Sequence, residues 1–243
     1  MILDGKILAD SLLEELSQKV SMLRGQGITP TLAVILVGDN PASLAYIRQK
    51  QKAASRIDAE IIFDHQPTTI NPEDLRQRIS AYNTDPAVHG LIIQRPVPHE
   101  VGDVARILRM VTGQKDVDGF LKDSRYDVPG ALAVGELLRV VHAKSDTTEK
   151  EYGTWLRKKQ IVVIGRGDTA GRPILSYLEK QHFTTSLIHS STPYPEKMMK
   201  RADIIISCVG RKHVVPAAAV TPGAILISVG IWRDNEGKLR GDY

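Results

Sequence analysis

The first part of the chain alternates between helix-like and strand-like patterns of hydrophobic residues. Over residues 7–23, apolar side chains return every three or four positions, which predicts an amphipathic helix. Residues 31–37 form a continuous apolar run with several β-branched side chains, which predicts a buried strand. Asn40 and Pro41 then stand as a helix cap and a first helical residue, so a helix is expected over residues 41–55.

The same alternation continues along the rest of the chain. Further helices are expected over residues 73–82 and 134–141, and the polar residues 146–153 are expected to form a loop that joins two halves. Shorter apolar runs predict the remaining strands, at residues 61–63, 90–94, 161–164, 185–189, 203–207 and 224–229. Strands that alternate with helices are typical of βαβ units and parallel sheets. The sequence therefore predicts an α/β fold with two domains, residues 1–142 and residues 143–243.

Composition places the chain among ordinary globular proteins. Of its 243 residues, 42% are hydrophobic and 25% are charged, which excludes wholesale disorder and low-complexity repeats. The single cysteine, Cys208, cannot form an internal disulfide. No segment reaches the roughly 18 apolar residues of a membrane span, and Asp4 and Gly5 interrupt the apolar stretch that a signal peptide needs. A soluble, cytoplasmic protein with no membrane partner is expected.

Charge and histidine spacing narrow the class of partner. The formal net charge is +4, but the basic residues are spread along the chain and aromatic residues make up only 5%. This pattern favours solvated surface charge over a nucleic-acid site, and it leaves an anionic substrate open. The seven histidines show no metal-ligand spacing, so no metal site is expected.

A glycine-rich turn follows the strand predicted at residues 161–164. Gly165, Gly167 and Gly171 precede a predicted helix, and strand, glycine turn and helix together are typical of a pyrophosphate site. Gly165 permits a tight turn, Gly167 lets the backbone approach phosphates, and Gly171 permits close helix packing. The spacing is one residue longer than the usual fingerprint, so an ordinary βα turn is the alternative. Because a helix N-terminus also attracts phosphate, we predict that the second domain is Rossmann-like and binds a dinucleotide.

The next strand distinguishes between the two nicotinamide cofactors. Sites for NAD place an acidic residue about 20 positions after the glycine turn, where it binds the ribose 2′-hydroxyl. Here Ser190 follows the strand over residues 185–189, and no carboxylate occurs before Glu196. Ser190 can donate a hydrogen bond to a 2′-phosphate and Arg166 can pair with it. NADP is therefore favoured over NAD, with a solvated turn as the alternative for the Ser/Thr cluster.

Reactive side chains follow the strands of the first half. Tyr46 and Lys50 are four residues apart and so share a helix face, on a helix that begins after the carboxyl end of a strand. Ligands of α/β sheets bind at this edge, where Gln94 and the acidic turn that contains Asp118 are also expected. An amine, an amide and a carboxylate beside a nicotinamide would form a reaction site. A surface position for the Tyr46/Lys50 pair is the alternative.

Taken in order, these motifs resemble the bifunctional methylenetetrahydrofolate dehydrogenase/cyclohydrolase family. Any one of them is weak, but the ordered set is specific and runs nearly from end to end of the chain. The matching segments are Ile2–Lys6, Val37–Ser43, Tyr46 with Lys50 and Lys52, Gln94 with Pro96, Lys115–Phe120, Ile164–Arg166, Gly171–Pro173, His189, Ser190 and Thr192, Ala202–Ile204, Gly237–Leu239, and Gly241 with Asp242.

The resemblance implies NADP-linked oxidation of 5,10-methylenetetrahydrofolate to the methenyl form, followed by hydrolysis to 10-formyltetrahydrofolate. These are reactions of one-carbon metabolism and purine biosynthesis. The resemblance further implies that Lys50 is the central catalytic group and that Gln94 orients it. It implies that Tyr46 stacks on the folate and that Asp118 anchors the pteridine. A homodimer formed through the cofactor domains is implied as well.

Three features depart from the family's pattern. Residues 129–132 read Pro-Gly-Ala-Leu where the family has Pro-Cys-Thr-Pro, and Gly167 stands where the family has serine. The chain also reaches Tyr243 without the family's Pro-Gly-Gly-Val-Gly-Pro segment and the helix after it, so a C-terminally shortened member is expected. Two alternatives therefore stay open, namely an enzyme with cyclohydrolase activity and impaired hydride transfer, and a non-catalytic homologue that binds NADP or folate.

Overall fold

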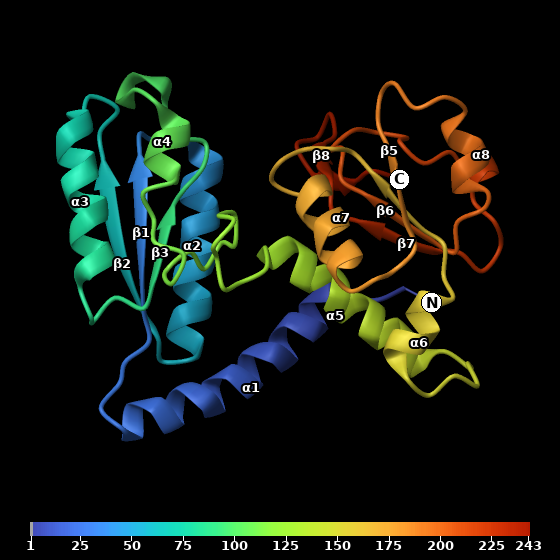
Figure 1. Ribbon diagram of the computed structural model, residues 1–243, viewed down its shortest axis with the longest axis horizontal. Coiled ribbons are helices and arrows are strands. Elements are labelled where there is room, and N and C mark those ends of the chain that lie inside the picture. The colour runs from blue at the N-terminus through green and yellow to red at the C-terminus, as the bar shows by residue number, and fades with distance from the viewer. Residues whose placement is uncertain (1) are drawn as a thin grey trace. The chain divides into compact units, whose positions relative to one another are not determined.

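A computed structural model describes residues 2–243, and the chain forms two compact units. The first unit ends at Tyr126 and the second comprises Asp127–Tyr243. The ribbon in Figure 1 shows the helices and strands of each unit. Each unit contains a parallel sheet with helices packed against it, which confirms the expected α/β class. The units divide earlier in the chain than the expected boundary after residue 142. The reason is that the helix over residues 129–144 packs against a helix of the second unit.

The first unit follows the predicted order of elements. Its sheet has the strand order β2-β1-β3, and both neighbouring pairs are parallel. The elements are α1 (Gly5–Gly25), β1 (Thr31–Val37), α2 (Pro41–Arg56), β2 (Glu60–Gln66), α3 (Pro72–Thr84), β3 (Gly90–Ile93), the 3₁₀ helix η1 (His99–Val101) and α4 (Val104–Leu108).

Alternate residues of β1 supply the two hydrophobic cores of this unit. One cluster contains Ala33, Ile35 and Val37 together with buried residues of α3 and α4. The second cluster contains Val34 and Leu36 together with Ile47 of α2. Because successive side chains of a strand point to opposite faces, the central strand β1 is covered on both sides and is apolar from Leu32 to Val37. Burial of both faces fixes α2 against the sheet.

Local capping explains where α2 begins. The Asn40 side chain accepts hydrogen bonds from the backbone N–H groups of Ala42 and Ser43, at 3.0 Å each. Pro41 occupies the first helical position, where its missing N–H costs no hydrogen bond. The predicted cap is therefore confirmed, and α2 leaves the sheet just beyond the carboxyl end of β1. This geometry brings the face of α2 to the edge of the sheet where ligands bind.

The second unit has a parallel sheet with the strand order β5-β4-β6-β7 and a separate antiparallel hairpin made by β8 and β9. Each strand of the parallel sheet lies within one residue of its predicted limits. The elements are α5 (Pro129–Lys144), α6 (Tyr152–Arg157), β4 (Ile161–Ile164), α7 (Gly171–Lys180), β5 (Thr185–Ile188), α8 (Pro195–Met199), β6 (Ile204–Ser207), the 3₁₀ helix η2 (Ala217–Ala219), β7 (Ile225–Ser228), β8 (Ile231–Arg233) and β9 (Leu239–Gly241).

Helices cover the sheet of the second unit as well. Val162 and Ile205 belong to a core cluster that includes Met199 of α8 and Ala219 of η2. On the other face α7 packs against β4 and β5, and α5 packs against α7. The approach of α5 to α7 is close, because a Cβ atom at Gly135 would lie 2.6 Å from the Tyr177 hydroxyl oxygen. This packing is why α5 belongs to the second unit.

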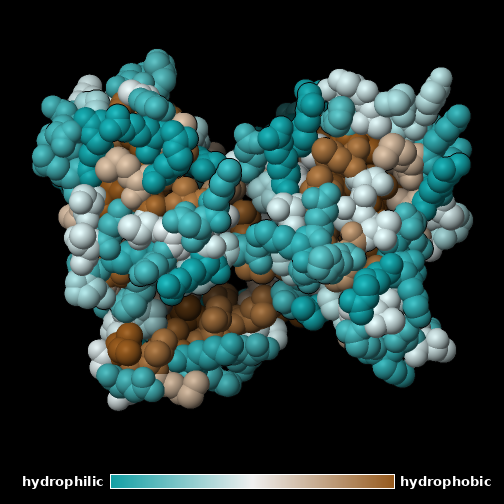
Figure 2. All heavy atoms as spheres, in the orientation of Figure 1, coloured by the Kyte–Doolittle hydropathy of each residue, from teal (hydrophilic) through white to brown (hydrophobic). Residues whose placement is uncertain are grey.

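Some elements differ from the expectations. The loop expected over residues 146–153 ends two residues early, because α6 begins at Tyr152, where the Glu151 carboxylate caps it. The sequence pattern also missed α4, α8 and the β8–β9 hairpin. Along α1, hydrophobic side chains gather on the surface, as Figure 2 shows, and the most exposed large ones are Ile7, Leu12, Leu16, Met22 and Leu23. Within residues 2–243, none of the helices has the length and apolar character to cross a membrane.

Candidate functional site

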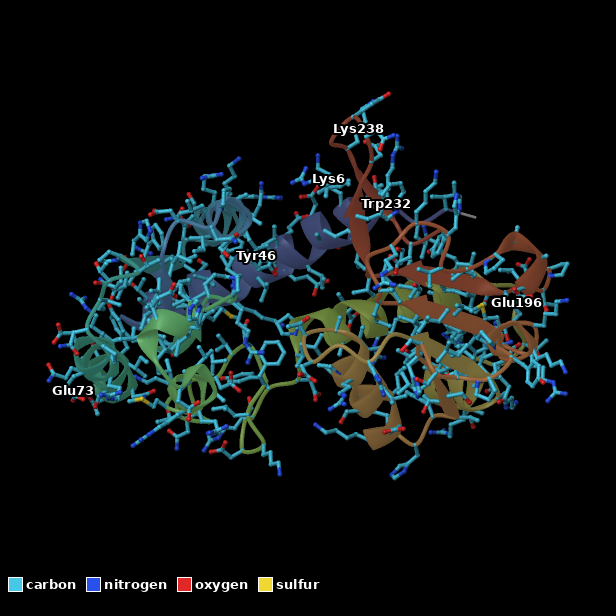
Figure 3. The ribbon with its side chains drawn as sticks, turned by 90° about the horizontal axis from the view of Figure 1, so that it is seen from above. Lys6, Tyr46, Glu73, Glu196, Trp232 and Lys238 are labelled. Carbon is cyan, nitrogen blue, oxygen red and sulfur yellow. The ribbon has the colours of Figure 1, made fainter. Side chains whose placement is uncertain are left out.

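Two side chains of α2 lie together on one face of the helix. The Lys50 Nζ atom is 4.8 Å from the centroid of the Tyr46 ring. Ile47, between them in sequence, is buried against the sheet and anchors the helix. The Tyr46 side chain, labelled in Figure 3, is 56% exposed, so its ring is accessible to a ligand. Lys52, two residues further on, is exposed on another side, as the helical spacing predicts.

The amide of Gln94 meets the Lys50 amine. Lys50 Nζ donates a hydrogen bond to Gln94 Oε1 at 3.3 Å, across 44 residues of sequence. Gln94 directly follows β3, and its backbone N–H continues the sheet by donating to the Ile35 carbonyl oxygen at 2.8 Å. Its side-chain amide donates to the Arg95 carbonyl oxygen at 3.1 Å. Two fixed contacts therefore hold the Gln94 oxygen toward Lys50.

The carboxylate of Asp118 completes this group of side chains. Its turn is tied to the sheet, because the Leu91 N–H donates to the Lys115 carbonyl oxygen at 2.8 Å. The buried Asp116 carboxylate accepts a hydrogen bond from the Leu121 N–H at 2.8 Å and so fixes the far side of the turn. Asp118 itself is placed where its charge acts on the Lys50 amine.

Burial and charge act against each other in this group. Burial lowers the pKa of Lys50, and the neighbouring Asp118 carboxylate partly opposes that decrease. Burial raises the pKa of Asp118, the Lys50 charge lowers it, and the Asp116 charge raises it again. An amine with a lowered pKa beside an acid with a raised pKa is the pattern expected of a proton-transfer site. We name Tyr46, Lys50, Gln94 and Asp118 the Lys50 cluster.

The sequence pattern did not predict the contacts that two neighbours of the Lys50 cluster make. The buried Ser43 hydroxyl donates to the Arg95 carbonyl oxygen at 3.2 Å and so joins α2 to the segment after β3. The Arg95 guanidinium lies over the Phe120 ring, with 4.2 Å between its carbon and the ring centroid. Ser43 could have been found, because it precedes Tyr46 by three residues and Lys50 by seven and so lies on the same helical face. No spacing rule links Arg95 to Phe120.

The glycine turn of the second unit has the geometry that a dinucleotide needs. Gly165 has a φ of +105°, which favours glycine, and a Cβ atom there would lie 3.1 Å from the Cys208 carbonyl oxygen. A Cβ atom at Gly171 would overlap with the Gly165 carbonyl oxygen, so the start of α7 packs directly on the turn. No atom lies within 4 Å of a Cβ atom built at Gly167, among the residues described. The turn is therefore open to a ligand at Gly167.

The surroundings of this turn fit an anionic ligand. The residue that caps α7, Ala170, has no side-chain hydrogen bond to the first turn of the helix. The positive end of the helix dipole is thus not neutralised by a capping carboxylate. Arg166 in the turn and Ser190 after β5 are both exposed. The donors present, a helix N-terminus, a guanidinium and a hydroxyl, are those that bind phosphate groups.

Comparison with known proteins decides the family. The profile described as tetrahydrofolate dehydrogenase/cyclohydrolase, catalytic domain, matches residues 3–118, and the profile of the NAD(P)-binding domain of the same enzymes matches residues 147–243. The bifunctional protein FolD of Polaromonas naphthalenivorans is 38% identical over 243 residues, which cover 99% of this chain and 85% of that protein. The chain belongs to the tetrahydrofolate dehydrogenase/cyclohydrolase family.

Solved structures of this family have the same fold. The bifunctional enzyme FolD from Campylobacter jejuni superposes with a TM-score of 0.89 at 32% identity, covering 100% of this chain and 85% of that one. The enzyme of Trypanosoma brucei, solved in complex with NADP and an inhibitor, superposes with a TM-score of 0.84 at 28% identity, covering 100% and 84%. The predicted family and its two-domain α/β architecture are thereby confirmed.

The two family profiles divide the candidate residues between the units. The whole Lys50 cluster falls within the match to the catalytic domain. The glycine turn, Arg166 and Ser190 fall within the match to the NAD(P)-binding domain. Among residues 2–243, no group of three or more His, Cys, Asp and Glu side chains is arranged to hold a metal ion. The candidate residues therefore fall into two groups, the Lys50 cluster in the first unit and the glycine turn with Arg166 and Ser190 in the second.

Proposed function

We propose that this protein oxidises 5,10-methylenetetrahydrofolate with NADP and hydrolyses the resulting 5,10-methenyltetrahydrofolate to 10-formyltetrahydrofolate. In the first step the methylene carbon loses a hydride, which leaves the methenyl cation and NADPH. In the second step water adds to the cationic carbon, one C–N bond of the ring opens, and a proton is released. The observation that carries the proposal is the hydrogen bond between Lys50 and Gln94 beside Asp118, within the half of the chain that matches the catalytic domain.

Lys50 is proposed as the group that takes a proton during hydrolysis. A lysine acts as a base only in its neutral form, and burial lowers the pKa of Lys50 toward the range where that form is populated. A methenyl cation bound nearby would lower it further, because like charges disfavour the protonated amine. Gln94 accepts a hydrogen bond from the amine and so orients its lone pair.

Tyr46 and Asp118 are proposed to bind the folate. The Tyr46 ring is exposed beside Lys50 and offers a flat surface on which a pteridine can stack. The Asp118 carboxylate can accept two N–H groups from the aminopyrimidine edge of the pteridine, which fixes the orientation of the ring. Burial raises the pKa of Asp118, and the positive charges of Lys50 and Arg95 oppose that increase.

NADP is proposed as the cofactor, and when bound it supplies the hydride acceptor. The turn from Gly165 to Gly171 would hold its pyrophosphate, and Arg166 and Ser190 would bind its 2′-phosphate. No carboxylate follows β5 before Glu196, so nothing in this segment would repel that phosphate. The NADP complex of the Trypanosoma brucei relative supports the same choice.

A homodimer is proposed from the family resemblance, and a cytoplasmic location from the composition of the chain. Sedimentation or native mass spectrometry tests the first, because a dimer has twice the chain mass of 26.8 kDa. A monomer at the concentrations used for activity would contradict it.

The proposed function is tested by measuring the hydrolysis of methenyltetrahydrofolate by three forms of the protein. The reaction is monitored as the decrease in methenyl absorbance. The wild type and Lys52→Met are expected to be equally active, because Lys52 is exposed on another side of α2. Lys50→Met is expected to lose at least about a thousandfold in rate, because no other amine belongs to the cluster. Equal hydrolysis by Lys50→Met and the wild type would contradict the proposed role of Lys50, and a wild type without hydrolysis would contradict the function.

A further inference from the structure

The strand order of the second unit reverses between β4 and β6, at the carboxyl ends of these two strands. The chain runs from β4 outward to β5, and then returns to the other side of β4 to form β6 and β7. In open parallel sheets a dinucleotide binds across the carboxyl ends of the strands where the order reverses. The glycine turn follows β4 at this point, and residues 208–211 follow β6. The two segments touch, because the Cys208 N–H donates to the Ile164 carbonyl oxygen at 2.8 Å.

A buried carboxylate holds the segment after β6 in place. Asp242 is fully buried, and one of its oxygens accepts from the Ser207 hydroxyl at 2.5 Å and from the Val209 N–H at 2.8 Å. The other oxygen accepts from the Arg211 N–H at 3.0 Å. A buried carboxylate is stable only when such donors replace water, and charge-assisted hydrogen bonds are stronger than neutral ones. These three contacts therefore fix the backbone of residues 207–211.

Asp242 is itself anchored from outside this segment. Its N–H donates to the Ser228 hydroxyl oxygen at 2.8 Å, at the end of β7, and its carbonyl oxygen accepts from the Val214 N–H at 3.0 Å. It directly follows β9 of the hairpin, whose strands Figure 3 marks by Trp232 and whose tip it marks by Lys238. A Cβ atom at Gly230 would overlap with the Asp242 carboxylate, so glycine there leaves room for it. The hairpin thus places the Asp242 side chain at the edge of the sheet.

The position of residues 207–211 indicates which half of NADP they would contact. Arg166 and Ser190 lie on the β5 side of the turn, where an adenosine 2′-phosphate would bind. The pyrophosphate would bind at the N-terminus of α7. The nicotinamide half then falls on the opposite side, at the carboxyl end of β6. We propose that Asp242 is a positioning residue for the nicotinamide half of NADP, acting through residues 207–211; this inference rests on the proposed function.

The test compares two nucleotides that share the adenosine half. Dissociation constants for NADP and for 2′,5′-ADP, which lacks the nicotinamide half, are measured by calorimetry for the wild type and Asp242→Asn. The amide cannot accept from all three donors, so NADP is expected to bind at least about tenfold more weakly, the equivalent of one charge-assisted hydrogen bond. The affinity for 2′,5′-ADP is expected to change less than about twofold, because that ligand does not reach β6.

Two further variants keep the test decisive. Asp234→Asn, in the same hairpin, removes a carboxylate that accepts from Arg240 Nε and the Lys238 N–H, each at 2.8 Å, and is expected to leave both affinities unchanged. Ser207→Ala removes one donor to Asp242 and is expected to weaken NADP alone, by a smaller factor. If Asp242→Asn does not fold, Ser207→Ala decides the matter.

Three results would overturn the inference. The first is an unchanged NADP affinity in Asp242→Asn, or in Ser207→Ala where that variant decides. The second is an equal loss of NADP and 2′,5′-ADP, which is the mark of general damage to the unit. The third is loss of NADP binding in Asp234→Asn as well. A wild type that binds neither nucleotide would instead refute the proposed function, and the inference with it, so the two failures are distinguishable.

Discussion

Lys50 lies between two opposing electrostatic influences. Burial favours its neutral form, and the Asp118 carboxylate favours its protonated form. The same carboxylate is raised in pKa by burial and by Asp116, and lowered by Lys50 and Arg95. The protonation states of the amine and the acid are thus linked, and a change at one is expected to appear in the pH dependence of the other.

This linkage predicts a pH shift in Asp118→Asn. Removing the carboxylate removes the influence that raises the pKa of Lys50, so that pKa falls further. Since the neutral amine is the proposed base, hydrolysis is expected to rise as pH rises through this pKa. In the variant this rise is expected to move to lower pH, by about one unit or less. The measurement is kcat for methenyltetrahydrofolate hydrolysis against pH at saturating substrate.

The matched control for this shift is Asp123→Asn. Asp123 is an exposed acid a few residues further along the same segment, and its removal is expected to leave the profile unchanged. A profile of Asp118→Asn that coincides with the wild type, or moves to higher pH, would show that Asp118 does not act on the Lys50 amine.

At the scale of elements, the glycine turn and the start of α7 form one packed unit with an open side. Gly171 faces the Gly165 carbonyl oxygen with no room for a Cβ atom, whereas the space beside Gly167 is free of atoms within 4 Å, in the part of the chain that the structure describes. The two glycines therefore serve different purposes, close packing in one case and ligand access in the other.

Single alanine substitutions are expected to separate these purposes. Gly171→Ala forces the turn and helix apart and should lower the free energy of unfolding by about 1–3 kcal/mol, the usual cost of overpacking. Gly167→Ala should leave thermal stability unchanged but weaken NADP, because its methyl group occupies space that the phosphates need. Melting curves and NADP titrations of both variants test this. A stable Gly171→Ala, or an unchanged NADP affinity in Gly167→Ala, would contradict the assignment.

The sequence pattern predicted the buried strands but not the short, exposed ones. The apolar runs of β1 and β4 are buried on both faces, so sequence alone located both within the limits observed. The β8–β9 hairpin has strands of three residues, too short for any period to be visible, and the Asp234 side chain organises its turn through local hydrogen bonds. Helix α6 depends on the Glu151 cap rather than on a hydrophobic stripe.

In the candidate site, too, sequence spacing predicted some contacts and not others. Tyr46 and Lys50 were paired correctly because a helix fixes residues four apart on one face, and Gln94 was placed because parallel strands end at a common edge. The contact between Arg95 and Phe120 depends on how two loops fold together. The burial of Asp242 against Ser207 spans 35 residues. Sequence spacing carries no information on such contacts.

At the scale of the whole molecule, the chain carries two sets of candidate functional residues that share no member. The Lys50 cluster belongs to the first unit, and the glycine turn with its arginine and serine belongs to the second. Hydrolysis of a methenyl substrate is expected to need only the first set, whereas oxidation of the methylene substrate is expected to need both.

This division predicts a separation of activities. Lys50→Met should lose hydrolysis and still bind NADP with the affinity of the wild type. Gly167→Ala should bind NADP more weakly and still hydrolyse methenyltetrahydrofolate that is supplied directly. Parallel hydrolysis assays and NADP titrations provide the measurement, with Lys52→Met as the control for each. Loss of both properties in either variant would show that the two sets depend on one another.

The central claim is that one chain performs both reactions, and a single assay tests it. The wild type is mixed with 5,10-methylenetetrahydrofolate and NADP, and NADPH and 10-formyltetrahydrofolate are followed together. The account predicts that both form and that one NADPH appears for each methylene group oxidised. NADPH formation no faster than without protein would contradict the account, and hydrolysis of added methenyltetrahydrofolate in the same sample would then leave only a cyclohydrolase.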